Sequence, residues 1–413
     1  MRVIVQKYGG TSVANTEKIK EVAQRIVKTR AAGNSVVAVV SALGDTTDEL
    51  LKLAHEITPD PPEREVDMLL ATGEQVSVAL LSMAIHTLGY DAISFTGAQA
   101  GIVTDNTHAK AKIVDVKSDR IRDELKRGKI VIVAGFQGVT VDQDITTLGR
   151  GGSDTTAVAL AAKLKADVCE IYTDVDGVYT TDPNLVQEAR KITAISYEEM
   201  LEMAATGAGV LQLRAAEYGR NYKVLIHVRS SFLDEPGTLI KEDTGMERAF
   251  VTGITYDTSE AKVTILGVPD KPGIAAKVFS SLAEADVNVD MIIQNVGEKG
   301  TADISFTVAR DNLGRAEKVV GEVVKELDAR GTNYDRSIAK ISLIGAGMRT
   351  HPGVAAEMFA TLAKNNINIQ MISTSSIKIS CVIRAEQVKT AVQALHKKFE
   401  LEKEPEEAKE GVG

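Results

Sequence analysis

Short polar motifs that could bind phosphate follow the apolar runs in the N-terminal half of the chain. The first, KYGGTS, begins at Lys7, directly after a run typical of a strand. Gly9 and Gly10 let the backbone approach a ligand closely, and Lys7 supplies a compact cation. The spacing is not that of the P-loop. The motif therefore predicts a phosphate-binding turn, although a tight turn beside a solvated lysine has the same sequence.

The segment GRGGSDTTAVALAA, from Gly149, is the strongest candidate for an anion site. Arg150 precedes two glycines, and Ser153 and Asp154 then open an apolar helix. A planar guanidinium and the donors of a helix N-terminus would converge on one spot, which suits a phosphate or a carboxylate. A plain Ser-Asp helix cap would explain neither the glycines nor the arginine.

Two further segments could complete a small-molecule pocket. SALGDTTDELL, from Ser41, places Ser41 and Thr47 near the start of a helix, where free N–H groups favour anions, although ordinary capping explains the same residues. Glu74 lies in ATGEQVSVALL, beside apolar positions at helical spacing. Its carboxylate could accept a ligand ammonium or could simply be solvated.

The run TDVDGVYTTDP, after an apolar strand, offers carboxylates to a nucleotide. Asp174 and Asp182 could face a nucleotide or the water shell of Mg²⁺, which prefers few protein ligands plus phosphates. The spacing excludes an EF-hand loop, and GAGMRT and GAGVLQ do not complete GxGxxG. The six histidines form no zinc-enzyme motif.

The composition is that of a globular protein with more than one core. A length of 413 residues predicts two or three domains at about 150 residues each. The net charge of -9 and the aromatic content of 4% disfavour binding to nucleic acid or to an anionic membrane. No apolar run approaches the roughly eighteen residues of a spanning helix, and no signal peptide is recognisable, so we expect a cytoplasmic protein.

An internal repeat organises the C-terminal third. Residues 272–292 (PGIAAKVFSSLAEADVNVDMI) match residues 352–372 (PGVAAEMFATLAKNNINIQMI) without a gap. A strand precedes each copy, at 262–267 and 340–345, so each unit begins strand, loop, helix, strand. The pattern after the first copy predicts a β-α-β-β-α-β order of the ferredoxin-like kind. A further strand near 249–257 cannot be assigned to either copy from the pattern.

The N-terminal part alternates buried strands with amphipathic helices. Runs 36–40 and 130–134 read as strands, and 17–27 as a helix with one buried face. This pattern predicts an α/β fold with a mostly parallel sheet, in which ligands bind beyond the carboxyl ends of the strands. The expected division is a domain over 1–245, repeat modules over 246–335 and 336–401, and a disordered tail over 402–413. The leading strand of the first module could belong to the second.

The motifs, taken together, resemble those of the aspartokinases of the amino-acid kinase superfamily. KYGGTS, VVSALGDTTDELL, LLATGEQVS, GRGGSDTTA and YTDVDGVYTTDP occur in the order of that family, and the repeated units resemble its ACT regulatory modules. The resemblance implies an amino-acid-kinase-like α/β sandwich followed by two ferredoxin-like ACT modules. One departure lies in GAGVLQLRAAE, where Gln212 and Leu213 replace the His-Pro of many relatives and Gly209 replaces a nucleotide-contacting lysine of some.

The implied reaction transfers the γ-phosphoryl group of ATP, with Mg²⁺, to the side-chain carboxylate of L-aspartate. The product, 4-phospho-L-aspartate, opens the route to lysine, threonine, methionine and diaminopimelate. The acceptor carboxylate, with a pKa of about 3.9, is already ionised at pH 7, so no general base is required. Catalysis should then consist of positioning and charge neutralisation.

The resemblance also assigns residue roles. Catalysis falls to Lys7, Arg150 and Asp154. The aspartate pocket would comprise Ser41, Thr47, Glu74, Arg150 and Ser153. The nucleotide side would comprise Lys7, Tyr8, Gly9, Gly10, Thr173, Asp174, Tyr179 and Asp182. No metal ligand is assigned.

The ACT modules imply feedback inhibition by lysine, threonine or both. They also imply pairing into a homo-oligomer or an α/β hetero-oligomer. In the hetero-oligomer, Met246 could start a separate regulatory subunit. The effector residues would be Asp270, Gly273, Ile274, Gln294, Asn368 and Ile369, with the duplicate loop near His351 and Val354. Three alternatives stay open: a kinase with another acceptor, a non-catalytic amino-acid sensor, and a nicotinamide dehydrogenase with ACT modules, which the missing dinucleotide fingerprint disfavours.

Overall fold

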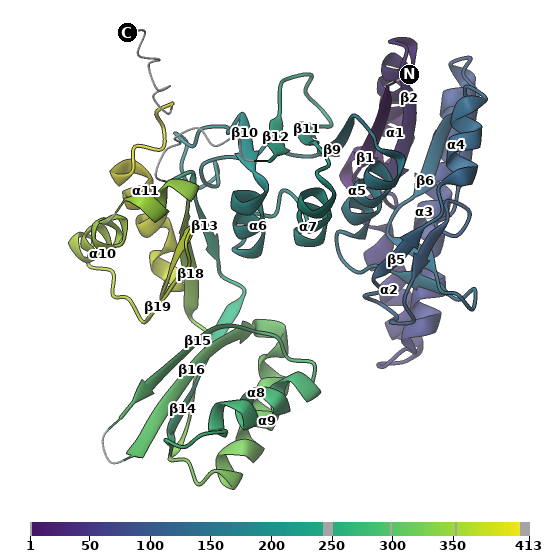
Figure 1. The fold of residues 1–413 in the computed structure, drawn as a ribbon. Coiled ribbons are helices and arrows are strands. Elements are labelled where there is room, and N and C mark those ends of the chain that lie inside the picture. The colour runs from purple at the N-terminus through teal and green to yellow at the C-terminus, as the bar shows by residue number, and fades with distance from the viewer. Residues whose placement is uncertain (1, 243–250, 298–299, 352, 405–413) are drawn as a thin grey trace, which may run out of the picture. The chain divides into compact units, whose positions relative to one another are not determined.

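A computed structural model describes residues 2–242, 251–297, 300–351 and 353–404 and divides the chain into two compact units (Figure 1). Unit 1 comprises Met1–Val178, Lys191–Ala205 and Gly209–Met246, and unit 2 comprises Tyr179–Arg190, Thr206–Ala208 and Glu247–Gly413. The predicted N-terminal domain was continuous. The structure instead assigns two short segments of it to unit 2, because Val186 packs in a hydrophobic cluster with Val251 and Ile254. Met246 and most of the predicted tail, from 405 on, lie outside the described residues.

Unit 1 is built on an eight-stranded sheet in the order β10-β12-β11-β9-β1-β2-β6-β3. Neighbouring strands pair in parallel except β11 and β12, which are antiparallel. The strands are β1 (Val3–Tyr8), β2 (Ser35–Val40), β3 (Ala92–Phe95), β6 (Ile130–Ala134), β9 (Val168–Thr173), β10 (Ala194–Ser196), β11 (Ile226–Ser230) and β12 (Thr238–Lys241). The predicted mostly parallel sheet is confirmed.

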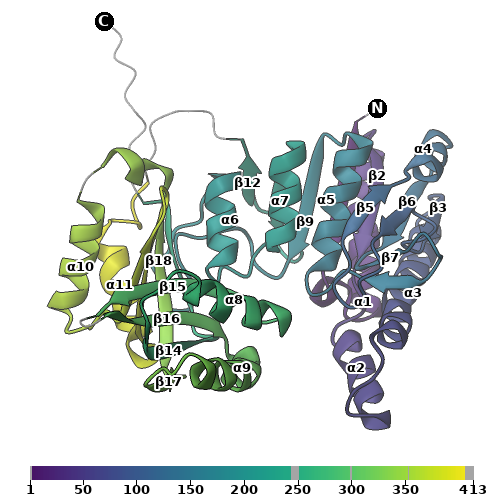
Figure 2. The same ribbon diagram turned by 60° about the horizontal axis from the view of Figure 1, so that its bottom comes forward.

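Helices cover both faces of this sheet. Every residue of β2 and β6 is buried, as expected for strands covered on both sides. On one face, α1 (Thr16–Ala31) and α3 (Glu63–Thr87) pack against β1, β2 and β6 through apolar side chains such as Ile26 and Leu81. On the other face α5 (Gly152–Leu164), which contacts β1, β2 and β9, stands beside α7 (Leu213–Tyr222) and α6 (Tyr197–Ala205) (Figure 2).

A second, four-stranded sheet of unit 1 has the order β5-β4-β7-β8 and packs near α3. Its strands are β4 (Ile102–Thr104), β5 (Ile113–Val116), β7 (Gln137–Val139) and β8 (Ile145–Thr147), and the remaining helices of the unit are α2 (Thr46–Ile57), α4 (Asp119–Lys126) and the short 3-10 helix η1 (Gly10–Val13).

Among the described helices, α3 alone is long and apolar enough by composition to cross a membrane, a possibility that the search for apolar runs did not predict. Its buried Asp67 and Glu74, and its packing against α1, β3 and β6, are those of a core helix.

Unit 2 contains two sheets of ferredoxin-like form. The first module runs β14 (Glu260–Pro269), α8 (Ile274–Glu284), β15 (Val289–Val296), β16 (Thr301–Ala309), α9 (Leu313–Glu326) and β17 (Gly331–Asp335), in the sheet order β15-β16-β14-β17. This is the predicted β-α-β-β-α-β order.

The fourth strand in the sheet of the second module comes from the chain segment that precedes the first module. It runs β18 (Ile338–Ile344), α10 (Val354–Lys364), β19 (Met371–Thr374), β20 (Lys378–Arg384) and α11 (Val388–Lys398). The sheet order is β13-β18-β20-β19, and β13 (Gly253–Asp257) pairs antiparallel with β18. The strand that the sequence could not assign therefore belongs to the second module, and the first module is inserted between that strand and the rest of its sheet.

Candidate active site

The site forms where the parallel strands of unit 1 end. The ends of β1, β2, β6 and β9 share one edge of the sheet, and the polar motifs follow them directly. In an α/β sheet this edge is the usual place for a ligand. The N-terminus of α5 lies at the same edge, because α5 packs back along β1 and β2.

An ion pair joins the first motif to the strongest one. Lys7 Nζ lies 2.7 Å from Asp154 Oδ1, and both side chains are almost buried. Asp154 sits in the first turn of α5, where the helix dipole favours a carboxylate, and its Oδ2 accepts a hydrogen bond from the N–H of Gln212. A Cβ on Gly9 would lie 3.3 Å from Lys7 Nζ, so the glycine leaves the ammonium approachable from the turn. The structure thus brings these predicted residues together.

The turn after β1 packs closely against the turn after β2, and the turn after β6 packs closely against the start of α5. A Cβ on Gly10 would lie 3.0 Å from the carbonyl oxygen of Gly44, and the N–H of Gly44 donates to the carbonyl of Gly10. Ser41 Oγ donates to Ser153 Oγ over 3.0 Å, beside Gly135, where any Cβ would collide with Ser153. The two predicted serines therefore face one spot, together with the glycine backbone.

Glu74 supplies a buried carboxylate with spare capacity. Its Oε1 accepts the N–H of Ala42 at 3.2 Å, whereas Oε2 is buried and has no hydrogen-bond partner in the part of the chain that the structure describes. Burial raises the pKa of Glu74 from 4.5 to about 7. A buried acceptor without a donor is costly, so this atom fits a ligand donor such as an ammonium group.

Two predicted aspartate contacts project from segments next to these groups. Arg150 is exposed and Thr47 half-buried, and neither side chain has a hydrogen-bond or ion-pair partner among the described residues. Gly151 follows Arg150 in the left-handed region, with φ of 69°, and begins the turn into α5. Both side chains remain available to a ligand.

The predicted nucleotide residues fall in both units. Thr173 ends β9, and its hydroxyl donates to Asp174 Oδ1 over 3.1 Å. Tyr179 and Asp182 belong to unit 2, where Asp182 accepts the Tyr256 hydroxyl at 2.7 Å. The side chain of Tyr8 is fully buried and stacks on Tyr172, so only its backbone can approach a nucleotide.

The predicted effector residues lie in both modules of unit 2. Gln294 is exposed on β15, an edge strand, and Asp270 is exposed in the loop before α8. Gly273 is the N-cap of α8 with φ of 94°, a conformation that suits glycine. Asn368 is exposed just before β19, and the side chains of Ile274 and Ile369 pack partly into their modules.

Sequence reasoning missed two charged residues that hold the motif of Arg150. Arg214 of α7 donates to the carbonyl oxygens of Leu148 at 2.7 Å and Ala111 at 2.9 Å. Asp67 of α3 is fully buried and accepts the Thr147 hydroxyl. Asp67 lies in no recognisable motif. Its one signal in the sequence is that it lies two helical turns before Glu74, on the same helix face.

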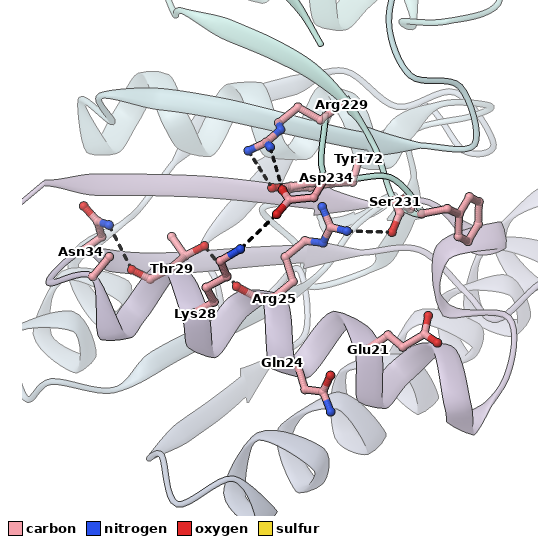
Figure 3. A pocket seen from close by; sticks show the side chains of 12 residues that line it. Glu21, Gln24, Arg25, Lys28, Thr29, Asn34, Tyr172, Arg229, Ser231 and Asp234 are labelled. Carbon is pink, nitrogen blue, oxygen red and sulfur yellow. Dashed lines mark hydrogen bonds and ion pairs between the residues drawn. The ribbon is translucent and has the colours of Figure 1, made fainter. Parts of the chain in front are cut away.

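A cavity of about 780 Å³ lies elsewhere on unit 1, between α1 and the end of β11 (Figure 3). Arg25 donates to the carbonyls of Ser230 and Ser231, and both Arg229 and Lys28 pair with Asp234. No predicted site residue lines this cavity. Its three cations already have acceptors from the chain, so it does not offer the free charge that a phosphate site needs.

No three His, Cys, Asp or Glu side chains of the described residues cluster as a metal site. Asp174 is exposed directly after the end of β9.

The fold and the site define a phosphate-binding α/β enzyme domain joined to paired regulatory modules, and comparisons with known proteins agree. Residues 2–230 match the amino acid kinase family, and residues 263–323 and 341–399 match the ACT domain. The aspartokinase of Mycolicibacterium smegmatis is 58% identical over 407 residues, covering 97% of each chain. The chain therefore belongs to the amino acid kinase family, in its aspartokinase branch.

Solved structures extend this relationship to the whole fold. E. coli aspartokinase III in complex with aspartate and ADP is 25% identical, with a TM-score of 0.81 over 96% of this chain and 99% of that one. The same enzyme in complex with lysine and aspartate, at the same identity and coverage, has a TM-score of 0.75.

Proposed function

We propose that the chain is an aspartate kinase, which transfers the γ-phosphoryl group of ATP to the side-chain carboxylate of L-aspartate. The bond between the γ-phosphorus and its bridging oxygen breaks, a carboxylate oxygen forms the new P–O bond, and ADP leaves. The observation that carries the proposal is the convergence of the Lys7–Asp154 pair with Ser41, Ser153 and the half-satisfied Glu74 at one sheet edge. The E. coli relative binds aspartate and ADP.

The chain's cations and donors address the main obstacle, which is the approach of two anions. Lys7 neutralises charge on the transferring phosphoryl group. Asp154 holds the ammonium group of Lys7 at the end of β1. Arg150 and the serines bind the carboxylates of aspartate, while Glu74 and Thr47 receive its ammonium end. Because Lys7 and the two serines are held by their partners before the substrate binds, these groups need little reorganisation in the transition state.

The nucleotide would lie along the turns after β1 and β9. The backbone of Tyr8, Gly9 and Gly10 can reach the phosphates, and Thr173 and Asp174 line the same edge. Mg²⁺, bound with ATP, would supply further charge neutralisation between the β- and γ-phosphates.

We further propose that an amino acid regulates this activity by binding to the ACT modules. The E. coli relative is solved with lysine bound. We infer that lysine, threonine or both inhibit this chain through residues such as Gln294 and Asn368, and that ACT pairing makes it an oligomer. The product would then feed the synthesis of lysine, threonine, methionine and diaminopimelate.

The direct test is acyl-phosphate formation from ATP and Mg²⁺ across a panel of amino acids, trapped as hydroxamate. We expect a signal with L-aspartate that lysine or threonine suppresses. Lys7→Ala should lower kcat by about a hundredfold or more, since one preorganised charge at the transferring group is lost. Lys20→Ala, an exposed lysine on α1, should leave kcat unchanged. A folded protein that binds ATP but phosphorylates a different carboxylate, or none, would refute the assignment.

A further inference from the structure

Asp67 is a buried carboxylate whose hydrogen bonds all lead toward one segment of the site. Here residues 148–151, between β8 and α5, are called the arginine loop. Asp67 has no exposed surface and lies on α3, two helical turns before Glu74 and so on the same helix face. Its Oδ1 accepts the hydroxyl of Thr147 at 2.5 Å, and Thr147 is the last residue before the arginine loop.

The second set of bonds fixes the neighbouring chain segment. The N–H of Ala109 donates to both carboxylate oxygens at 3.1 Å, and His108 Nδ1 lies 2.8 Å from Oδ2. Since a carboxylate only accepts, this ring nitrogen carries the hydrogen. Ala109 has φ of 61°, in the left-handed region that a residue with a Cβ rarely adopts. Asp67 therefore holds a strained backbone turn in place.

The backbone turn at Ala109 also supports the arginine loop. The N–H of Ala111 donates to the carbonyl of Thr147 at 2.9 Å, and Arg214 joins the carbonyls of Leu148 and Ala111. A Cβ on Gly149 would lie only 3.2 Å from the carbonyl oxygen of Ala109. The backbone of the loop is thus packed against the turn that Asp67 fixes.

We propose that Asp67 is a positioning residue that sets the direction of Arg150 for the acceptor carboxylate, an inference that rests on the proposed function. Arg150 is exposed and has no side-chain partner among the described residues, so its backbone alone aims it. Asp67 acts through Thr147 and Ala109 without contacting either substrate. Its loss should weaken aspartate binding and leave the Lys7 side of the site intact.

The first test is Asp67→Asn, which keeps the shape of the side chain and replaces one acceptor oxygen with a donor. We expect the KM for aspartate to rise by about tenfold to a hundredfold, because a small misplacement of a substrate-orienting group has effects of this size. The KM for ATP should change by less than about threefold on the same reasoning. Glu199→Gln, at an equally buried carboxylate that accepts the Ser196 hydroxyl, should leave both KM values unchanged.

The second test is rescue. Glycine adopts the left-handed region without help, so Ala109→Gly should restore part of the aspartate KM in the Asp67→Asn background. Both variants are compared at a temperature at which they are fully folded, so that a change in stability alone cannot produce the rescue. Hydrogen exchange of the backbone amides of residues 147–152, measured by mass spectrometry, should quicken in Asp67→Asn and slow again in the double variant.

The outcomes separate the two claims. If the wild-type chain does not phosphorylate aspartate, the proposed function fails, while the exchange measurement still reports whether Asp67 holds the loop. If the wild-type chain phosphorylates aspartate but folded Asp67→Asn shows an unchanged aspartate KM, the positioning role is wrong. Equal rises in the KM values for ATP and aspartate, without rescue by Ala109→Gly, would also overturn it.

Discussion

At the scale of single residues, the site combines one charge pair with two charged groups that have no ion-pair partner among the described residues. Lys7 and Asp154 neutralise each other at 2.7 Å, so the ammonium is held in place before a phosphate arrives. Arg150 is exposed, whereas Glu74 is buried and one of its oxygens has no hydrogen-bond partner among the described residues. The substrate must supply the missing donor, which makes Glu74 the most pH-sensitive contact of the proposed pocket.

We predict that the KM for aspartate falls about tenfold between pH 6 and pH 8. Burial raises the pKa of Glu74 to about 7, so the carboxylate that pairs with the substrate ammonium is mostly protonated at pH 6 and mostly ionised at pH 8. The measurement is the aspartate KM at saturating ATP across this range. Glu74→Gln should bind aspartate weakly at every pH and lose this dependence. A wild-type KM that is flat across the range would contradict the role of Glu74.

The same residue gives an independent effect on stability. Because the folded-state pKa lies above the usual value of 4.5, ionisation of Glu74 destabilises the unliganded fold, and this cost grows as the pH rises from about 4.5 through 7. Glu74→Gln should therefore raise the unfolding midpoint of the unliganded chain at pH 8 and not at pH 4.5. The change in unfolding free energy at pH 8 should be roughly 3 kcal/mol, from the size of the pKa shift.

At the scale of elements, the start of α5 leaves no room for a side chain at Gly151. Gly151 has φ of 69°, and a Cβ there would lie 2.0 Å from Cγ and 2.8 Å from Cβ of Gln212, whose N–H donates to Asp154. We predict that Gly151→Ala lowers kcat/KM for aspartate by about a hundredfold, because it must displace the N-terminus of α5.

Gly33→Ala is the matched control for that substitution. Gly33 has φ of 88°, yet nothing lies within 4 Å of an added Cβ. This variant should cost about 1–2 kcal/mol of stability from the left-handed backbone alone and keep its kcat/KM. Equal losses of activity in the two variants would show that backbone strain, and not the contact with Gln212, is responsible.

The elements also show which parts of the fold a sequence can specify. The run 130–134 was predicted with the bounds that β6 has, and the run 36–40 falls within β2, because strands buried on both faces are continuous apolar runs. The strand β13 could not be placed, since its residues pair with residues of β18 that lie 83 to 91 positions further along the chain and the first module intervenes. Pairing over such a distance leaves no local pattern.

The candidate site shows the same limit. Lys7, Ser41, Ser153 and Asp154 were predicted because each lies in a motif directly after a strand or at a helix start, and the structure brings them together. Asp67 and Arg214 were missed, because their partners are carbonyls, hydroxyls and N–H groups more than forty residues away. Tyr8 was predicted at the nucleotide, but its side chain turns into the core.

At the scale of the whole molecule, catalysis and regulation occupy separate compact units linked by exchanged segments. The segment Tyr179–Arg190 follows the end of β9 after five further residues of unit 1 and packs into unit 2, where Thr180 Oγ1 lies 3.0 Å from His396 Nε2. Its Val186 lies in the core of the second ACT module. The segment is therefore a covalent route from the end of β9 to that module, by which an effector could influence the nucleotide side.

The central claim is that the side-chain carboxylate of L-aspartate receives the phosphoryl group. The most direct measurement is reduction of the product with borohydride, which converts an acyl phosphate to an alcohol at the carbon that carried the phosphate. The account predicts homoserine from L-aspartate, with ATP, Mg²⁺ and the intact chain all required. Recovery of 3-amino-4-hydroxybutanoate, which marks the main-chain carboxylate, or of no amino alcohol at all, would contradict it.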